Sequence, residues 1–207
     1  MDLLNRAIRH LYGIGNDPIL ECDAVIALGY GLTIHRALPD AERKVLDEAR
    51  KIAVSCECPV AWASSSYFYD GCEDDEDRLK EQYLTDDKMI PDIHSIKSSA
   101  GITNSVTEAR EIKRALSGAG IEPRTIAVVL DWPHARSARI IYEKTFPGVR
   151  IMLHSVEGKW GKSHSAKLQR SGWKWLIANL GRHFFLRTLG IEYVADIQHP
   201  TKPCVES

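Results

Sequence analysis

Short apolar runs of strand length alternate with amphipathic helical patterns along this chain, and this alternation constrains the fold more than any other feature. Residues 23–28 and 124–130 are almost entirely apolar, which is typical of central parallel strands covered on both faces. Further runs of strand length are 59–63, 93–96 and 149–153. The pattern predicts an α/β fold, a doubly wound and mostly parallel sheet with helices on both faces. Right-handed crossovers then place the loops that follow the strands at one edge of the sheet.

Helical periodicity fills the intervals between these strands. We expect helices over residues 2–12, 40–53, from 73–77 toward Leu84, 105–118, 133–146 and 165–189. Asp40 is the expected N-cap of its helix. The chain is predicted to form a single domain over 1–207, with a core at 22–155, a loop and helical region at 156–198 and a tail at 199–207.

Composition excludes several functional classes. The net charge is −1, so no overall basic field favours nucleic acid. No window approaches the ~20 apolar residues of a membrane span, and we recognise no signal peptide. The five cysteines lack the spacing of a zinc site or a disulfide framework, which favours a reducing cytoplasm. Cys56 and Cys58 are interpreted as structural, and the sequence does not indicate an oligomeric state.

The turn after the first apolar run resembles the opening of a nucleotide or phosphate loop. Gly29 and Gly31 would let the backbone approach a ligand and turn free amides toward an anion. The alternative is that both glycines serve only a tight turn. A third glycine opening a helix is missing, so the sequence does not support a nicotinamide or flavin site. Ser64 follows the run 59–63 and adds a hydroxyl at the same predicted edge.

A second polar turn lies at residues 98–108. Ser105 and Glu108 match a capping box, with Ser105 at the N-cap and Glu108 at the third helical position. The turn holds more polar groups than one cap uses, so it is also a candidate cradle for an anion or a ribose. The additional candidates are Ser99, Thr103, Asn104 and Thr107.

The segment from 131 to 139 is the most reactive-looking part of the chain. His134 could be a general acid or base oriented by Asp131, and Arg136 or Arg139 could hold a phosphate or carboxylate. The alternative is a helix-start histidine followed by a solvated arginine face. Histidines also follow other predicted strands, but their spacing does not match a metal-binding motif, so no metal is expected.

With these residues laid out, the chain resembles the YdcF/SanA/ElyC-like family, described as domain of unknown function 218. The likeness covers roughly 22–155 and rests on the segments 23–31, 103–109 and 128–134. The chain departs from the family pattern at Ala109, where asparagine is usual, and in the spacing of the arginines after His134. The resemblance implies a Rossmann-like fold with a pocket over the strand ends. It also implies a link to S-adenosylmethionine binding.

Three functional hypotheses follow. The first is a cytoplasmic protein that binds a nucleotide-like or phosphorylated small molecule, with S-adenosylmethionine as one candidate. The second is a hydrolase or group-transfer enzyme that uses His134 as acid or base, with Asp131 orienting it. The third is a non-catalytic partner protein of an envelope or biosynthetic pathway. The candidate ligand-binding residues are Gly29, Gly31, Ser64, Ser99, Thr103, Asn104, Thr107, Glu108 and Arg136.

Overall fold

The computed structural model describes residues 15–29, 31–33, 37–63, 73–85, 95–98, 104–157 and 172–195. The helix expected at 2–12 and the tail at 199–207 lie outside these residues. The same holds for the candidate site residues Ser64, Ser99 and Thr103.

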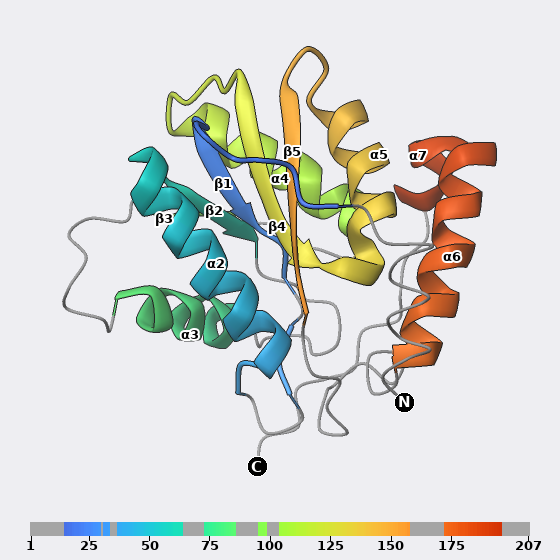
Figure 1. The fold of residues 1–207 in the computed structure, drawn as a ribbon, viewed down its shortest axis with the longest axis horizontal. Helices are drawn as coiled ribbons and strands as arrows, with labels where there is room; N and C mark the ends of the chain where they lie inside the picture. Colours follow the sequence, from blue (N-terminus) through green and yellow to red (C-terminus); the bar gives the residue numbers. More distant parts are fainter. Residues whose placement is uncertain are drawn as a thin grey trace.

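Five parallel strands form the sheet in the described part of the chain (Figure 1). They are β1 (Ala24–Ala27), β2 (Val60–Ala63), β3 (Ser95–Ser98), β4 (Thr125–Asp131) and β5 (Arg150–Val156). Their order is β3-β2-β1-β4-β5, and every neighbouring pair is parallel. The protein therefore has the expected α/β, Rossmann-like fold. The strand expected at 93–96 overlaps β3 at Ser95 and Ile96, and its first two residues lie outside the described part of the chain.

The sheet divides the core into two layers, and successive side chains of β1 and of Leu28 after it face these layers alternately. Ala24, Ile26 and Leu28 face the layer formed with α4 (Ser105–Gly118) and α5 (Ala135–Thr145). Val25 and Ala27 face α2 (Asp40–Cys56), beside which lies α3 (Glu73–Thr85). All five of these side chains are fully buried. Burying an isoleucine or leucine stabilises the fold by roughly 1.5–3 kcal/mol, so strands buried on both sides hold the sheet together. This explains why the strand sequences are continuously apolar.

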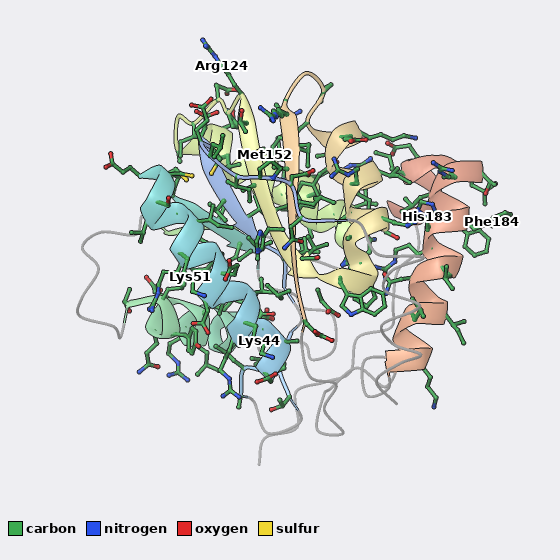
Figure 2. The ribbon with its side chains drawn as sticks, in the orientation of Figure 1. Lys44, Lys51, Arg124, Met152, His183 and Phe184 are labelled. Carbon is green, nitrogen blue, oxygen red and sulfur yellow. The ribbon has the colours of Figure 1, made fainter. Side chains whose placement is uncertain are left out.

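The carboxyl-terminal helices pack on one flank of the molecule. Helix α6 (Gly172–Thr188) contacts α5 and the short 3-10 helix η1 (Trp132–His134), and α7 (Gly190–Ala195) contacts α4 (Figure 1). His183 lies on the side of α6 nearer α5, whereas Phe184 points away from the molecule (Figure 2). Arg182 on the same helix contacts His134 of η1, the element that directly follows β4.

The cap of α2 differs from the expectation. Pro39 is the N-cap, and Asp40 is the first helical residue. Proline cannot offer a side-chain hydrogen bond there, and the charges of Asp40 and Glu42 in the first turn instead complement the helix dipole. The helix ends at Cys56, and the C-cap residue Glu57 adopts the left-handed conformation that lets the chain reverse into β2.

Candidate functional site

The carboxyl ends of β1 and β4 lie side by side at the centre of the sheet. The chain leaves β1 toward α2 on one face and leaves β4 toward α5 on the other, which makes this the switch point of the fold. Helix α4 begins at the same place. The Gly29 amide donates to Glu108 Oε1 at 3.1 Å, and Ser105 Oγ lies 3.3 Å from His134 Nε2. The turn after β1, the start of α4 and the end of β4 therefore meet at one rim, as the sequence predicts.

The capping box of α4 is formed by Asn104 and Thr107, one residue earlier than predicted. Asn104 Oδ1 accepts from the amides of Val106 and Thr107 at 2.9 and 3.0 Å. Thr107 Oγ1 accepts from the Asn104 amide at 3.1 Å. Asparagine is among the best N-cap residues, and here its cap leaves Ser105 and Glu108 available for other contacts. The cap assignment to Ser105 and Glu108 is therefore wrong.

Ser105, His134 and Arg182 form a group that we call the His134 cluster. Arg182 on α6 donates from Nη1 to His134 Nε2 at 2.9 Å and to Ser105 Oγ at 3.4 Å. The three residues come from three different helical elements, η1, α4 and α6. His134 is 5% exposed, whereas Ser105 and Arg182 are partly exposed. The cluster thus brings a hydroxyl, an imidazole and a guanidinium to the rim.

The imidazole of His134 is held in its neutral form. Burial, and then the nearby Arg182 charge, lower the pKa of His134 well below its ordinary value of 6.5. A guanidinium only donates hydrogen bonds, so Nε2 must accept and the ring proton must sit on Nδ1. Nε2 is thereby the basic nitrogen of the ring. The Ser105 hydroxyl is oriented near it.

The other candidates at the end of β4 have different surroundings. Asp131 is the last residue of β4 and is fully buried, and its predicted role in orienting His134 stays a prediction. Arg136 is partly exposed in the first turn of α5. Arg139 is directed elsewhere, because its Nη2 donates to Asp17 Oδ2 at 2.7 Å. Asp17 also accepts from the Leu153 amide at 2.8 Å, so this pair fastens the segment before β1 to the edge strand β5.

A buried charged group, which we call the Lys80 cluster, lies under the same rim. It consists of Lys80 and Glu76 from α3, Glu42 from α2 and Glu108 from α4. Lys80 Nζ lies 2.7 Å from Glu76 Oε1 and 3.1 Å from Glu42 Oε1, and the Lys80 side chain has no exposed surface. Burial disfavours the ammonium, but the Glu42 and Glu76 charges raise the pKa of Lys80 above its ordinary value. The lysine is therefore a fixed buried cation.

Glu108 is the member of the Lys80 cluster that touches the turn after β1. Burial raises the pKa of Glu108 to about 8, although the Gly29 amide and Lys80 act in the opposite direction. The carboxyl is thus mainly protonated at neutral pH. A perturbed carboxyl at the switch point of an α/β sheet is a feature that functional sites often show.

The turn after β1 leaves no room for a side chain at its first glycine. A Cβ at Gly29 would lie 3.0 Å from Lys80 Nζ and 3.5 Å from the Ala63 carbonyl oxygen. Gly31 has a φ of 68°, a conformation that glycine adopts readily. Both glycines are therefore required by the local structure, and their contact with a ligand stays a prediction.

In the ranges that the structure describes, no group of three or more His, Cys, Asp or Glu side chains could hold a metal ion. None of the helices in the described part combines the length and apolar character needed to span a bilayer.

Fold and rim together define an α/β protein of the doubly wound class with a neutral histidine, an arginine and a buried charged cluster at its switch point. Comparisons of the chain with protein-family models, curated proteins and solved structures found no match. The resemblance to the YdcF-like family therefore stays a prediction.

Sequence reasoning missed Arg182, Lys80 and Glu42. The four-residue spacing of Glu76 and Lys80 indicates a pair on one helix face, but not its burial. Arg182 lies 48 residues after His134, and no local pattern connects the two.

Proposed function

We propose that this protein binds a nucleotide-like or phosphorylated small molecule at the carboxyl edge of its sheet, with S-adenosylmethionine as one candidate. The observation that carries the proposal is the double contact of Arg182 with His134 and Ser105. A cytoplasmic location and membership of the YdcF-like family belong to the same proposal.

The electrostatics at this position favour an anion. The amino end of α4 carries a partial positive charge from its backbone amides. The Arg182 guanidinium lies against Ser105, the first residue of that helix, and His134 beside it is neutral. A helix amino end and a guanidinium each attract anions, so a phosphate or carboxylate at this position would interact favourably with both. In S-adenosylmethionine the group that fits this position is the carboxylate.

The remaining candidates would surround such a ligand. The turn at Gly29 and Gly31 supplies close backbone approach, and Arg136 lies in the first turn of the neighbouring helix α5. Ser64, Ser99 and Thr103 are proposed as additional polar contacts, although they lie outside the described residues. The net charge of −1 favours a small-molecule ligand over nucleic acid.

Binding can be tested with a panel of nucleotides, sugar phosphates and S-adenosylmethionine, by thermal shift and then calorimetry. We expect at least one member to bind and Arg182→Gln to weaken its affinity about tenfold, as expected for a lost charge-assisted hydrogen bond. Arg187→Gln on the same helix is the matched control, because Arg187 is exposed. An affinity that is unchanged in Arg182→Gln, or a panel with no binder, contradicts the proposal.

A second function, hydrolysis or group transfer, is favoured by the 3.3 Å contact between Ser105 Oγ and His134 Nε2. A neutral imidazole near a hydroxyl at a helix amino end has the arrangement of a base and an activated nucleophile. The shorter bond from Arg182, at 2.9 Å, occupies the lone pair that the base would need. Binding therefore ranks first, and catalysis would require an anionic substrate to draw the guanidinium away.

The two functions separate in the variants His134→Ala and Ser105→Ala. Turnover of p-nitrophenyl esters or phosphates that disappears in both variants, with ligand binding retained, favours the enzyme. Binding without turnover in the unmodified protein favours the first function. If His134→Ala and Arg136→Ala changed neither binding nor turnover, the rim would not be the site.

A further inference from the structure

Three cysteines gather at the edge of the sheet opposite the rim. Cys22 precedes β1, Cys56 ends α2 and Cys58 precedes β2. Cys22 Sγ lies 3.5 Å from Cys58 Sγ, and the Cys22 thiol also hydrogen-bonds with Cys56. All three are free thiols. The Cys22 thiol therefore contacts the thiols of both sequence neighbours of Glu57, Cys56 and Cys58.

The fold brings these thiols together for identifiable reasons. The parallel register pairs Val25 with Val60, which sets the start of β1 beside the start of β2. The left-handed conformation of Glu57 turns the chain between Cys56 and Cys58. The Cys58 amide donates to the Ala53 carbonyl at 3.1 Å, which fixes the position of Cys58 against the last turn of α2.

We propose that Cys22 and Cys58 form a thiol–disulfide exchange site that reacts with low-molecular-weight disulfides such as oxidised glutathione. The Cys58 thiolate attacks one sulfur of the small disulfide, forms a mixed disulfide and releases one thiol. The Cys22 thiolate then attacks Cys58 Sγ and releases the second thiol. Two protein thiols are oxidised to one disulfide, and one small disulfide is reduced to two thiols that carry away both protons.

The geometry favours this pair. A disulfide needs the two sulfurs about 1.5 Å closer than they are now, which side-chain rotation supplies when the flanking backbones are neighbours in a sheet. Cys22 is 8% exposed, whereas Cys58 is half-buried, so an external disulfide meets Cys58 first. The bond would tie β1 to β2 across a separation of 36 residues.

Cys22, whose thiolate must attack Cys58 Sγ in the second step, sets the pH dependence of the exchange. The hydrogen bond with Cys58, together with burial, raises the pKa of Cys22 above its ordinary value. Burial and the contact with Cys22 raise the pKa of Cys56 to about 11. The carboxylates on the adjoining segments, Glu21 and Asp23, also disfavour a thiolate here. Exchange should therefore be slow at neutral pH and accelerate as pH rises.

The test uses the full chain, reduced, freed of reductant and incubated with oxidised glutathione. Remaining thiols are blocked with iodoacetamide, and peptides are analysed without reduction. Before blocking, we expect a chain mass lower by two hydrogens. After blocking, we expect a cross-link between the Cys22 and Cys58 peptides, and dithiothreitol should reverse it completely. Cys56→Ser is the matched control and should keep this cross-link, whereas Cys58→Ala should lose it.

A parallel incubation of wild-type chain in urea shows whether the fold selects the pair. Unfolded chain should distribute its disulfides among all five cysteines. Glutathione adducts without the Cys22–Cys58 cross-link in the folded chain would overturn the proposal, as would the same disulfide distribution with and without urea. Neither result depends on a ligand at the rim.

Discussion

Replacing Glu108 with glutamine should remove a loss of stability that the wild-type fold undergoes as pH rises. Glu108 is buried, accepts a hydrogen bond from the Gly29 amide at 3.1 Å and lies beside the Glu42, Glu76 and Lys80 charges. A glutamine side-chain oxygen can accept the same hydrogen bond. Below pH 8 the substitution replaces one neutral group by another of nearly the same shape. Above pH 8 it removes a buried negative charge.

The magnitude follows from the pKa of Glu108, which burial raises from 4.5 to about 8. The folded state holds this proton more tightly than the unfolded state does. The stabilisation that the protonated Glu108 carboxyl contributes is therefore fully present below pH 4.5 and is lost as pH rises through 8. The free energy of unfolding falls by roughly 1 kcal/mol per pH unit in that interval, and by about 2–3 kcal/mol between pH 6 and pH 9.

Urea unfolding of wild type and Glu108→Gln at pH 6, 7, 8 and 9 measures this difference. The two proteins should be similar at pH 6, and the variant should gain about 2–3 kcal/mol relative to wild type by pH 9. Tyr142 does not interfere, because burial and the Glu108 charge raise the pKa of Tyr142 well above this range. Glu143→Gln, at an exposed position of α5, should follow the wild-type profile. A stability difference that is independent of pH would refute a buried, protonated Glu108.

Lys80→Met should lower the free energy of unfolding by about 3–5 kcal/mol, because it leaves buried carboxylates without their cation. Urea unfolding measures this loss, and Lys51→Met at an exposed position is a nearly neutral control. Gly29→Ala should lower the free energy of unfolding by on the order of 1–3 kcal/mol, since its Cβ would lie 3.0 Å from Lys80 Nζ. Gly118→Ala has open space around its Cβ and should not destabilise the fold in the same assay. Asn104→Ala should cost about 1 kcal/mol through the lost cap of α4, seen as a lower melting temperature, and a neutral result would mean that the cap is dispensable.

The sheet could be predicted from sequence because each central strand is buried on both faces. Residues such as Val25 and Ile26 point to opposite layers and are both fully buried, so every position of β1 must be apolar. A short and continuously apolar run of this kind is typical of a central parallel strand. The strand β3 lies at the edge of the sheet. Its sequence, Ser-Ile-Lys-Ser, is not a continuous apolar run and therefore carries a weaker signal.

Capping was less predictable because neighbouring residues offer chemically equivalent caps. Asn104 and Ser105 can both cap a helix, and each has a suitable partner three residues later, Thr107 and Glu108. The choice between them depends on the tertiary contact of Glu108 with Gly29, which makes that carboxylate unavailable to the helix start. A local pattern could not reveal this contact across 79 residues.

The charged groups at the rim illustrate a more general limit. Lys80 and Arg182 look like ordinary surface residues in the sequence, since lysine and arginine on amphipathic helices usually face solvent. The structure uses them differently: Lys80 is enclosed by carboxylates from two helices, and Arg182 reaches His134 from α6. Both placements depend on how separate helices pack around the switch point, which sequence periodicity does not encode. Of the residues that sequence did identify there, Gly29 and His134 lie just after β1 and β4, and their position follows from the parallel sheet.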